Sequence, residues 1–434
     1  MIGEVISGKF RLERAIAKGG MGVVYEGTHL HLKRKVALKI LHAHLVRKDN
    51  SMERFRREAI VLAKLDHPHA VRIYDFGIHQ GMPYIAMEFI DGIELADVLA
   101  IQGFLSLPRI VHMAEQILDV LSSAHKLGII HRDLKPANIM LCNTEQNKTD
   151  SKEDFVRVVD FGIAFLRDQD EPRMTQQGHV HGTAAYMSPE QCRGLDIDAR
   201  SDLYSLGCVI YELISGQPPF VSDGSIETLS AHLYREPASL RQTFPEREVP
   251  VAMEAFVMRA LAKQRSARFP SADAMRQELI RAYKESGLKT ARPPRTLLPN
   301  QVAEWWVSDT DAPPVALLEL NMDAASRDIL LTTLGVAAVK SVRIEPGDSL
   351  LGYGLVMVLA QDGQQGLAVC EKLLATPQTP PIVLCGPEDD LELMTTAIGV
   401  GVHDYIPLPL DPTDVARKVV RILRRYTKLS SADA

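Results

Sequence analysis

The chain has 434 residues, of which 46% are hydrophobic and 24% are charged, so it can bury sizeable cores, and its length favours two or three domains. Its 55 acidic residues outnumber its 49 basic residues, for a net charge of -6, so it lacks the positive field that draws proteins to nucleic acid. The N-terminal residues form no apolar signal region, and the longest apolar runs are far shorter than the roughly 20 residues that span a bilayer. We therefore expect a cytoplasmic protein with neither a nucleic-acid partner nor a membrane partner.

The five cysteines are scattered and form no C-x-x-C pair, so we expect reduced thiols rather than a zinc site or a disulfide framework. Histidines recur two residues apart at several places, such as His29 with His31 and His67 with His69. No carboxylate or cysteine pattern completes a set of metal ligands around them, so we do not expect these pairs to bind metal.

The first functional pattern is the glycine-dense stretch AIAKGGMGVVYEG, residues 15–27, between two strand-like runs. In such a turn, missing side chains let backbone N–H groups approach phosphate oxygens. The strand KVALKIL, residues 35–41, follows, and a period of two places Ala37 and Lys39 on one face. The Lys39 ammonium is then predicted to lie beside the space that an adenine and its phosphates would fill.

The stretch SMERFRREAIVLAKL, residues 51–65, predicts a helix in which a carboxylate shares the apolar stripe. Phe55, Glu58, Ala59 and Leu62 stand at i, i+3, i+4 and i+7, so Glu58 is predicted to face the core. A carboxylate there needs a cationic partner, and Lys39 is the expected one. The alternative is that Glu58 reaches solvent.

The stretch HRDLKPAN, residues 131–138, places the carboxylate of Asp133, the ammonium of Lys135 and the amide of Asn138 on one loop. Transfer of a phosphoryl group from a metal-bound nucleotide to a hydroxyl is a reaction that needs this set. A further acid, Asp160, ends the apolar strand in VRVVDFGIA, residues 156–164. Oxygen ligands from Asp160 and Asn138 suit magnesium. The polar segment between the two motifs, residues 141–155, is predicted to be an extended surface hairpin.

In order and spacing these motifs resemble those of the bacterial Hanks-type, eukaryotic-like serine/threonine protein kinases, over residues 10–283. Two later stretches, GTAAYMSPE at 182–190 and DARSDLYSLGCVIYELISG at 198–216, continue the pattern, and the second predicts an amphipathic helix. The resemblance implies an α+β bilobal kinase fold with an N-lobe at 10–90 and a C-lobe at 91–283. It also implies ATP and Mg²⁺ as cofactors, with Mn²⁺ as an alternative metal, and protein substrates as partners.

The resemblance assigns a role to each matching position. Asp133 is similar to the catalytic base, Lys135 to the lysine that steadies the transferred phosphate, and Lys39 with Glu58 to the activating ion pair. Asn138 and Asp160 resemble the metal ligands, Met87 the gatekeeper, and Glu88 to Ile90 the backbone that meets the adenine edge, with Ala37 beside it. Glu190 resembles the glutamate that pairs with a late arginine, here Arg268. The glycine-rich loop corresponds to Ile16, Ala17, Lys18, Gly19, Gly20, Met21, Gly22, Val23 and Val24.

Two further features concern rate and regulation. Ala17 stands where the first glycine of the loop is usual, and an added methyl group costs little unless the residue needs a positive φ. Arg132 precedes the catalytic base, where related kinases gather an activation-segment phosphate. Thr175 is the only hydroxyl residue between Asp160 and Thr183, so we expect it to be the phosphorylated residue. The alternative is a solvated loop threonine.

Residues 284–314 predict a proline-rich linker that also carries Trp305 and Trp306. From residue 315, five short apolar runs alternate with helical stretches, which predicts an α/β doubly wound parallel sheet. Residues 315–427 resemble a flavodoxin-like response-regulator receiver domain. The positions where a working receiver has acids, a hydroxyl and a lysine are Glu319-Leu320, Leu359-Ala360, Cys385 and Leu408, and Asp362 is predicted to stand beyond the pocket. The phosphoacceptor is therefore predicted to be missing.

We therefore expect an autophosphorylating, ATP-dependent serine/threonine protein kinase of cytosolic signalling. Its C-terminal domain is expected to serve self-association or regulator docking, and a decayed domain is the alternative. The competing functional class is a catalytically silent scaffold, which the charged set Lys39, Asp133, Asn138 and Asp160 disfavours. A phosphorelay receiver with an attached kinase is disfavoured by the missing acceptor.

Overall fold

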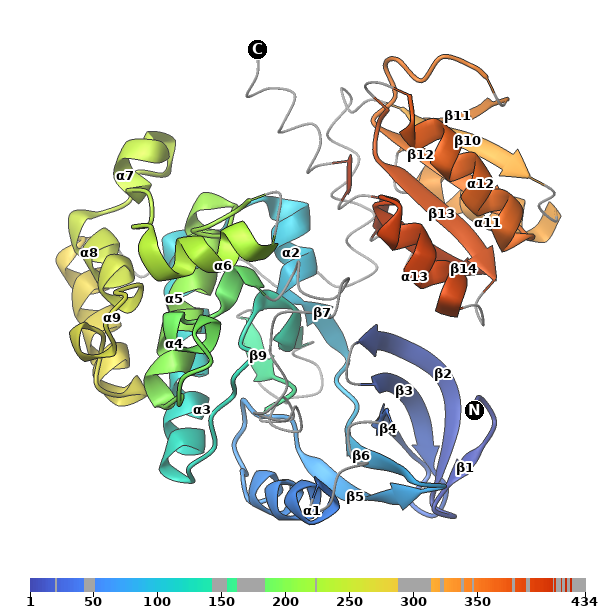
Figure 1. Ribbon diagram of the computed structural model, residues 1–434. Helices are drawn as coiled ribbons and strands as arrows, with labels where there is room; N and C mark the ends of the chain where they lie inside the picture. Colours follow the sequence, from blue (N-terminus) through green and yellow to red (C-terminus); the bar gives the residue numbers. More distant parts are fainter. Residues whose placement is uncertain are drawn as a thin grey trace. The chain divides into compact units, whose positions relative to one another are not determined.

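The structure is a computed structural model (Figure 1). It describes residues 1–19, 22–42, 51–142, 154–161, 184–222, 225–287, 314–320, 324–336, 339–345, 347–376, 379–387, 391–408, 410, 415, 418–419 and 422–423. Two compact units divide the chain, the first holding Met1–Leu99 and Gly103–Thr296 and the second holding Leu297–Ala434 together with the short stretch Ala100–Gln102. Most of the predicted linker, with its two tryptophans, lies outside the described residues. None of the described helices is long and apolar enough to cross a membrane.

The first unit begins with an antiparallel sheet of six strands in the order β1-β2-β3-β4-β6-β5. One helix, α1 (Ser51–Leu62), follows β4 in the chain and packs on β5. The strands are β1 (Val5–Ile6), β2 (Phe10–Gly19), β3 (Gly22–His29), β4 (Arg34–Leu41), β5 (Ile73–His79) and β6 (Met82–Glu88). The expected pattern of short strands around one helix is confirmed.

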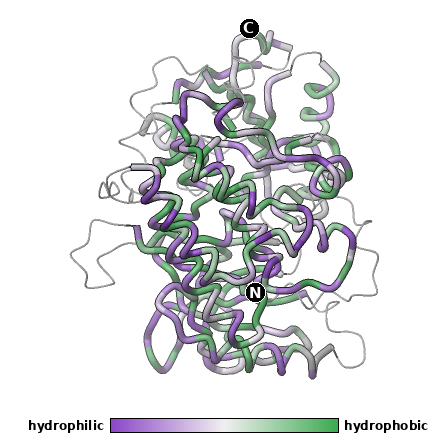
Figure 2. Tube along the Cα trace, turned by 90° about the vertical axis from the view of Figure 1, so that its left-hand side faces the viewer, coloured by the Kyte–Doolittle hydropathy of each residue, from purple (hydrophilic) through white to green (hydrophobic). Residues whose placement is uncertain are grey.

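Strand β4 separates two cores by its period of two. Val36, Leu38 and Ile40 join the core on one face of the sheet, and Ala37 and Leu41 join the core shared with the helical part of the unit. Lys39 stands between Ala37 and Leu41 on that second face, and its side chain is only 9% exposed. The predicted placement of Ala37 and Lys39 on one face is confirmed. Short hydrophilic and hydrophobic stretches alternate along the trace in Figure 2.

The rest of the first unit is mostly helical, with one small sheet of three antiparallel strands in the order β7-β8-β9. These strands are β7 (Gly92–Glu94), β8 (Ile139–Cys142) and β9 (Phe155–Val158). The helices are α2 (Leu95–Gln102), α3 (Leu107–Lys126), α4 (Pro189–Cys192), α5 (Ala199–Ser215), α6 (Ser225–Tyr234), α7 (Leu240–Thr243), α8 (Val251–Ala260) and α9 (Ala272–Glu285).

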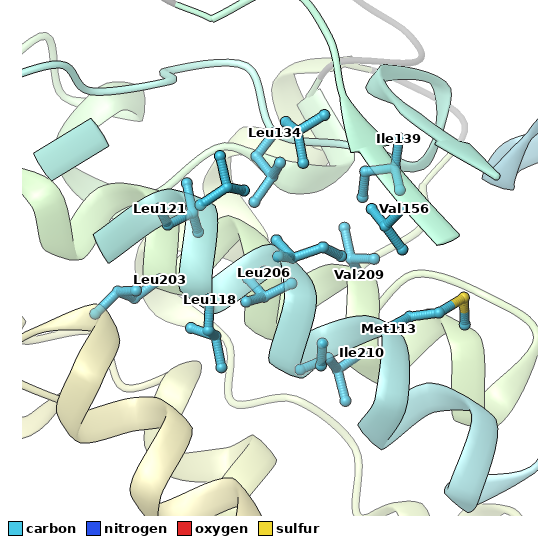
Figure 3. Packing of buried hydrophobic residues seen from close by; sticks show 14 of the residues in the cluster. Met113, Leu118, Leu121, Leu134, Ile139, Val156, Leu203, Leu206, Val209 and Ile210 are labelled. Atoms are coloured by element: carbon cyan, nitrogen blue, oxygen red, sulfur yellow. The ribbon is translucent and has the colours of Figure 1, made fainter. Parts of the chain in front are cut away.

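Helix α5 is the centre of this helical part. The Asp198 side chain caps its first turn by accepting from the Arg200 N–H, and Gly216 ends it in the left-handed conformation with φ 86°. Leucines of α3 and α5 face each other in Figure 3 and share one core. The predicted helix is confirmed, and its apolar residues are buried, but the solvent-facing side expected of an amphipathic helix is absent, because from Ser201 to Ser215 only Glu212 is not buried. Neighbouring helices cover α5 on more sides than one, including α3 and α8.

The polar segment before Asp160 connects two antiparallel strands, as expected of a hairpin, since Cys142 of β8 pairs with Phe155 of β9. Residues 143–153 lie outside the described residues. The returning strand is anchored where it re-enters the fold, because Arg109 Nη2 and Nε donate to the two carboxylate oxygens of Asp154. These side chains are 2% and 0% exposed, so this is a buried ion pair.

The second unit contains a parallel sheet in the order β11-β10-β12-β13-β14. Its strands are β10 (Val315–Leu320), β11 (Ser341–Ile344), β12 (Leu355–Ala360), β13 (Ile382–Pro387) and β14 (Asp404–Leu408). Helix α11 (Ala324–Val336) contributes to the core on one face, and α12 (Gly363–Leu374) and α13 (Leu391–Gly399) to the core on the other. The predicted parallel sheet with helices on both faces is confirmed for these elements. The helix expected over 411–423 falls largely outside the described residues.

Candidate active site

The loop of residues 131–138 is fixed from below by the buried carboxylate of Asp202 in α5. The backbone N–H groups of His131 and Arg132 donate to its two oxygens at 2.8 and 2.9 Å, and His125 Nε2 lies 2.8 Å away. Burial opposes the charged form, yet the bond to His125 and the nearby histidines hold the pKa of Asp202 below its usual range. Arg132 adopts a positive φ of 70°, which these bonds stabilise.

Sequence reasoning missed Asp202. The available signal was an acid in the first turn of a helix rich in apolar residues, since such an acid must have partners when it is buried.

The structure brings together the three side chains predicted on this loop. Lys135 Nζ lies 2.9 Å from Asp133 Oδ2, and Asn138 Nδ2 donates to the Asp133 carbonyl oxygen at 2.7 Å and to Oδ2 at 3.2 Å. Pro136 and Asn138 belong to a short 3-10 helix that directs the chain from the loop into β8. A carboxylate, an ammonium and an amide therefore meet at one point, and the Asn138 amide oxygen is of a chemical type that could hold a cation.

Asp160 follows β9 and reaches the same region. The Val159 N–H donates to the Asn138 carbonyl oxygen at 3.0 Å, and His131 Nε2 lies 2.9 Å from the Val159 carbonyl oxygen. The ring of Phe161 packs on His131 with ring centres 4.8 Å apart. Asp160 therefore stands directly after a backbone segment that is bonded to the loop of residues 131–138, and its own φ is 63°.

Lys39 forms its ion pair with Asp160, at 2.8 Å between Nζ and Oδ2. Partial burial opposes the charged form of Asp160, but the charge and hydrogen bond of Lys39 hold the pKa of this carboxyl below its usual range. The Lys39 ammonium thus occupies one of the oxygens that a metal ion would need.

The predicted pair between Lys39 and Glu58 is not formed, and this expectation is corrected. Phe55, Ala59 and Leu62 of α1 are buried as predicted, at 2%, 1% and 8% exposure. Glu58 is only partly buried, at the margin of that stripe, and no ion pair joins it to another described residue. Because Glu58 keeps contact with solvent, it needs no cationic partner, and Asp160 takes the lysine instead.

The glycine-rich stretch forms the tip of the β2–β3 hairpin, where Gly19 pairs with Gly22. Gly20 and Met21 lie outside the described residues. Gly22 has φ 155°, and a Cβ there would lie 2.0 Å from the Ile40 carbonyl oxygen, so only glycine fits. Ala17 pairs with Val24 inside the hairpin, an extended position that alanine adopts without strain.

An apolar cavity lies between the predicted gatekeeper and the metal ligand. Met87 and Ile85 of β6, Leu62 at the end of α1, Leu65 after it, and Asp160 line it, together with Val71, Ile73 and Phe161. Met87 is buried, and Glu88 follows it at the end of β6. Strand β6 and the residues that follow β9 therefore border one space.

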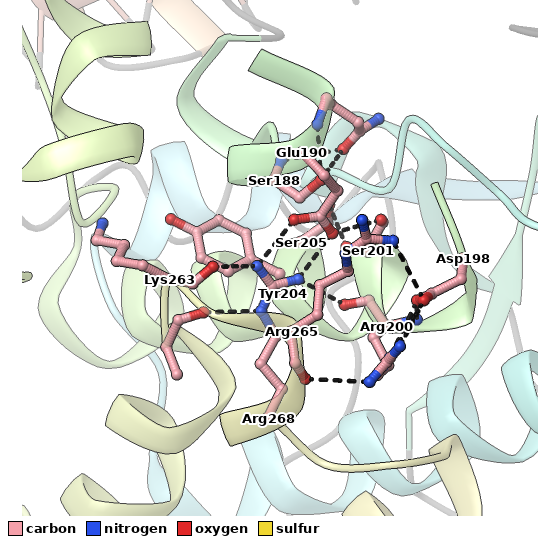
Figure 4. A network of polar contacts seen from close by, with 12 residues as sticks. Ser188, Glu190, Asp198, Arg200, Ser201, Tyr204, Ser205, Lys263, Arg265 and Arg268 are labelled. Atoms are coloured by element: carbon pink, nitrogen blue, oxygen red, sulfur yellow. Dashed lines mark hydrogen bonds and ion pairs between the residues drawn. The ribbon is translucent and has the colours of Figure 1, made fainter. Parts of the chain in front are cut away.

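The predicted pair of Glu190 and Arg268 is confirmed and is the centre of a larger network (Figure 4). Arg268 Nη1 and Nη2 donate to the two Glu190 oxygens at 2.8 and 2.9 Å, and the Ser201 hydroxyl donates to Oε1. Arg268 also donates to backbone carbonyl oxygens, including that of Ala262 at 2.7 Å. Both side chains are buried, so this network fixes α4 against the end of the helical part.

Residues 10–280 match the family described as Protein kinase domain. The chain belongs to this family. The residues that the site brings together belong to the predicted kinase motifs and lie within the matched range.

The protein kinase family members with similar sequences include two bacterial proteins. Serine/threonine-protein kinase pkn3 of Myxococcus xanthus is 40% identical over 298 residues, which cover 68% of this chain and 54% of that protein. Serine/threonine-protein kinase PknB of Mycobacterium tuberculosis is 38% identical over 282 residues, which cover 64% of this chain and 43% of that protein. This chain thus spans about half the length of these relatives.

The kinase domain also resembles solved structures. The crystal structure of the Mycobacterium tuberculosis PknI kinase domain superposes with a TM-score of 0.51 at 26% identity, covering 65% of this chain and 99% of that one. The fold of the first unit is therefore a protein kinase fold.

The second unit places the remaining predicted positions. Glu319, near the end of β10, is paired with Arg327 of α11, whose Nε lies 2.8 Å from Oε2, and the Glu319 side chain is only 6% exposed. Leu359, Ala360 and Cys385 are fully buried. The Asp362 side chain accepts from the N–H groups of Gln364 and Gln365, so it caps α12. Asp362 is thus engaged at the helix start, and its place beyond a receiver pocket stays a prediction.

Some predicted kinase positions cannot be placed. Thr175 and Thr183 lie outside the described residues, as do Gly20 and Met21 of the loop. The expected contact of Arg132 with a phosphorylated Thr175 therefore stays a prediction.

Proposed function

We propose that this chain is an ATP- and magnesium-dependent protein serine/threonine kinase that transfers the γ-phosphoryl group to protein hydroxyls and phosphorylates itself. One observation carries the proposal: Asp133, Lys135 and Asn138 meet within 3.2 Å on a loop that is bonded to the backbone beside Asp160. The serine/threonine class is supported by Lys135 in HRDLKPAN and by the names of the similar kinases.

In this proposal each side chain has one task. Asp133 orients the acceptor hydroxyl and takes its proton, and Lys135, held beside it, neutralises charge on the transferred phosphoryl group. Asn138 and Asp160 offer amide and carboxylate oxygens, the donors that magnesium prefers, so they would hold the metal. When bound, the metal neutralises the phosphates of ATP.

The pair of Lys39 and Asp160 implies a rearrangement before transfer. Asp160 cannot give both oxygens to a metal while one of them is bonded to Lys39. We infer that Lys39 moves to the nucleotide phosphates, and that Glu58, which is free of other ion pairs within the described residues, then pairs with it.

Regulation by phosphorylation is the second part of the proposal. A phosphate on Thr175 would bring roughly -1.5 to -2 charges toward Arg132 and order the segment that carries it. Mass spectrometry after incubation with ATP should find phosphate on Thr175, and Thr175→Ala should lower the rate. Full activity of the variant would show that this residue does not control the enzyme.

The third part concerns residues 315–427, which we propose to be a receiver-like domain that docks a regulator or a second copy of the chain. The strand order β11-β10-β12-β13-β14 supports the flavodoxin-like fold. The ion pair of Glu319 with Arg327 supports the loss of phosphoacceptor chemistry, because it uses the acid that a metal would need.

Two experiments test the receiver-like domain. The intact mass of the full chain after incubation with acetyl phosphate and magnesium should not change, whereas a stoichiometric adduct on Asp362 would contradict the proposal. For docking, the full chain should differ from a chain ending at residue 287 in oligomeric state, kinase rate or recovered partners. Identical behaviour of the two would favour a decayed domain.

We also propose a cytoplasmic location and no nucleic-acid or membrane partner. The five free cysteines, four of them buried, support a reducing compartment. Cell fractionation of the tagged full chain tests this.

The direct test of the proposed function is incubation of the purified full chain with magnesium and ATP labelled in its γ-phosphate, with a generic protein acceptor. Label on serine or threonine is expected. Absence of transfer together with retained ATP binding would favour the silent scaffold.

A further inference from the structure

Arg157, in the strand that leads to Asp160, contacts two other segments of the kinase domain. Its Nη1 donates to the Ala70 carbonyl oxygen at 2.8 Å and to Glu88 Oε2 at 3.1 Å, and its Nη2 donates to Glu88 Oε1 at 3.4 Å. The Arg157 and Glu88 side chains are 13% and 23% exposed. One guanidinium thus joins β9, the segment after α1 and the residue that follows Met87.

The segment around Ala70 is bonded to β9 through its backbone as well. The Val158 N–H donates to the His69 carbonyl oxygen at 2.8 Å, and the Val71 N–H donates to the Val158 carbonyl oxygen at 3.2 Å. His69 Nδ1 lies 2.9 Å from the Val156 carbonyl oxygen. Ala70 itself is fully buried. Arg157 therefore lies in a strand whose backbone is hydrogen-bonded to the segment around Ala70. Neither segment can shift without breaking several of these bonds.

Both the backbone N–H and the carboxylate of Glu88 are hydrogen-bonded. Its N–H donates to the Arg72 carbonyl oxygen at 2.9 Å, and its carboxylate accepts from Arg157. A bidentate guanidinium–carboxylate pair fixes direction as well as distance, which a single ammonium cannot do. The position of Glu88 is thereby linked to Arg157 of β9, which precedes Asp160 by three residues.

We propose that Arg157 is a positioning residue that sets the separation between the adenine-binding backbone at Glu88 to Ile90 and the metal ligand Asp160. The inference rests on the proposed function, which assigns the adenine of ATP to that backbone and the metal ion to Asp160. ATP must contact both ends of this distance at once, so a fixed spacing makes the two contacts cooperative. A pair that served stability alone would leave nucleotide affinity unchanged once the protein is folded.

The test measures Mg-ATP affinity and steady-state kinetics of the full chain for Arg157→Gln, Glu88→Gln and the double variant. Each single change should weaken ATP binding by about fivefold or more. The double variant should bind ATP no more weakly than whichever single variant binds it more weakly. KM for ATP should rise more than kcat falls, because the catalytic loop is untouched. Arg157→Lys should recover only part of the affinity.

The matched control is Arg281→Gln, which removes an exposed arginine of α9 that pairs with Glu278 and Glu285. It should bind ATP as the unaltered chain does. All measurements are made well below the melting temperature of each variant, so that unfolding does not lower the affinity. Wild-type affinity in Arg157→Gln, or strictly additive losses in the double variant, would overturn the inference. An unaltered chain that binds no ATP would instead contradict the proposed function.

Discussion

Lys39 Nζ lies 2.8 Å from Asp160 Oδ2, and Glu58, the carboxylate expected to hold this lysine, stays partly exposed at the margin of α1. The ammonium is therefore paired with the carboxylate that we propose as a metal ligand. We therefore expect changes at these residues to lower turnover while the protein stays folded. The first two predictions test this expectation.

Glu58→Gln should leave the free energy of unfolding within about 0.5 kcal/mol of the unaltered chain, because no ion pair of a described residue is lost. The kinase rate should nevertheless fall by about tenfold or more, since Lys39 would lack its second carboxylate during transfer. Urea unfolding and the labelled-ATP assay measure the two quantities. A large loss of stability with an unchanged rate would show that Glu58 has a structural role only.

Lys39→Met and Asp160→Asn should each lower phosphoryl transfer by on the order of a hundredfold or more, because each removes a charge that stabilises the transition state. Circular dichroism should show that both variants are folded. Undiminished transfer by either purified variant would contradict the assigned roles.

Arg268→Ala should destabilise the kinase domain by about 3–5 kcal/mol, because it leaves the buried Glu190 carboxylate without its partner. Arg268→Lys should have a stability between those of the unaltered chain and Arg268→Ala. One ammonium cannot reproduce both bonds to Glu190 and the bond to the Ala262 carbonyl oxygen. Thermal unfolding measures the effect, and Arg281→Ala, an exposed position, is the control. Equal melting temperatures for all three variants would show that the network is unimportant for stability.

The same pair predicts a pH dependence of stability. Burial opposes the charged form of Glu190, but the bonds from Arg268 and Ser201 hold its pKa below the usual value of 4.5. A lowered folded-state pKa contributes stability that is present above the unfolded pKa and is lost as pH falls through the folded pKa. The difference in unfolding free energy between the unaltered chain and Glu190→Gln should be full near neutral pH and shrink below about pH 4.5. A difference that grows on acidification would contradict the assignment.

The sequence predicted those parts of the site that short patterns determine. Period two placed Ala37 and Lys39 on one face, and the spacing within HRDLKPAN brought Asp133, Lys135 and Asn138 together. These depend on residues a few positions apart, which local backbone geometry relates directly.

Contacts between distant segments could not be derived in this way. The local pattern marks Asp202 as an acid that needs partners, but it does not indicate that the partner is the loop at His131. Nor does it indicate that Arg327 pairs with Glu319, or that neighbouring helices cover α5 on more than one side. Whether Lys39 pairs with Glu58 or with Asp160 depends on where α1 packs in the domain, which apolar spacing does not determine. These features belong to tertiary packing rather than to pattern.

The central claim is that Asp133 is the base of a phosphoryl-transfer site, and the most direct measurement compares Asp133→Asn with the unaltered full chain in the labelled-ATP assay. Asp196→Asn makes the same chemical change at an exposed position of the same domain and is the control. The account predicts that Asp133→Asn binds Mg-ATP normally and loses transfer by on the order of a hundredfold or more, while Asp196→Asn keeps the full rate. Transfer by Asp133→Asn at the rate of the unaltered chain would contradict the account.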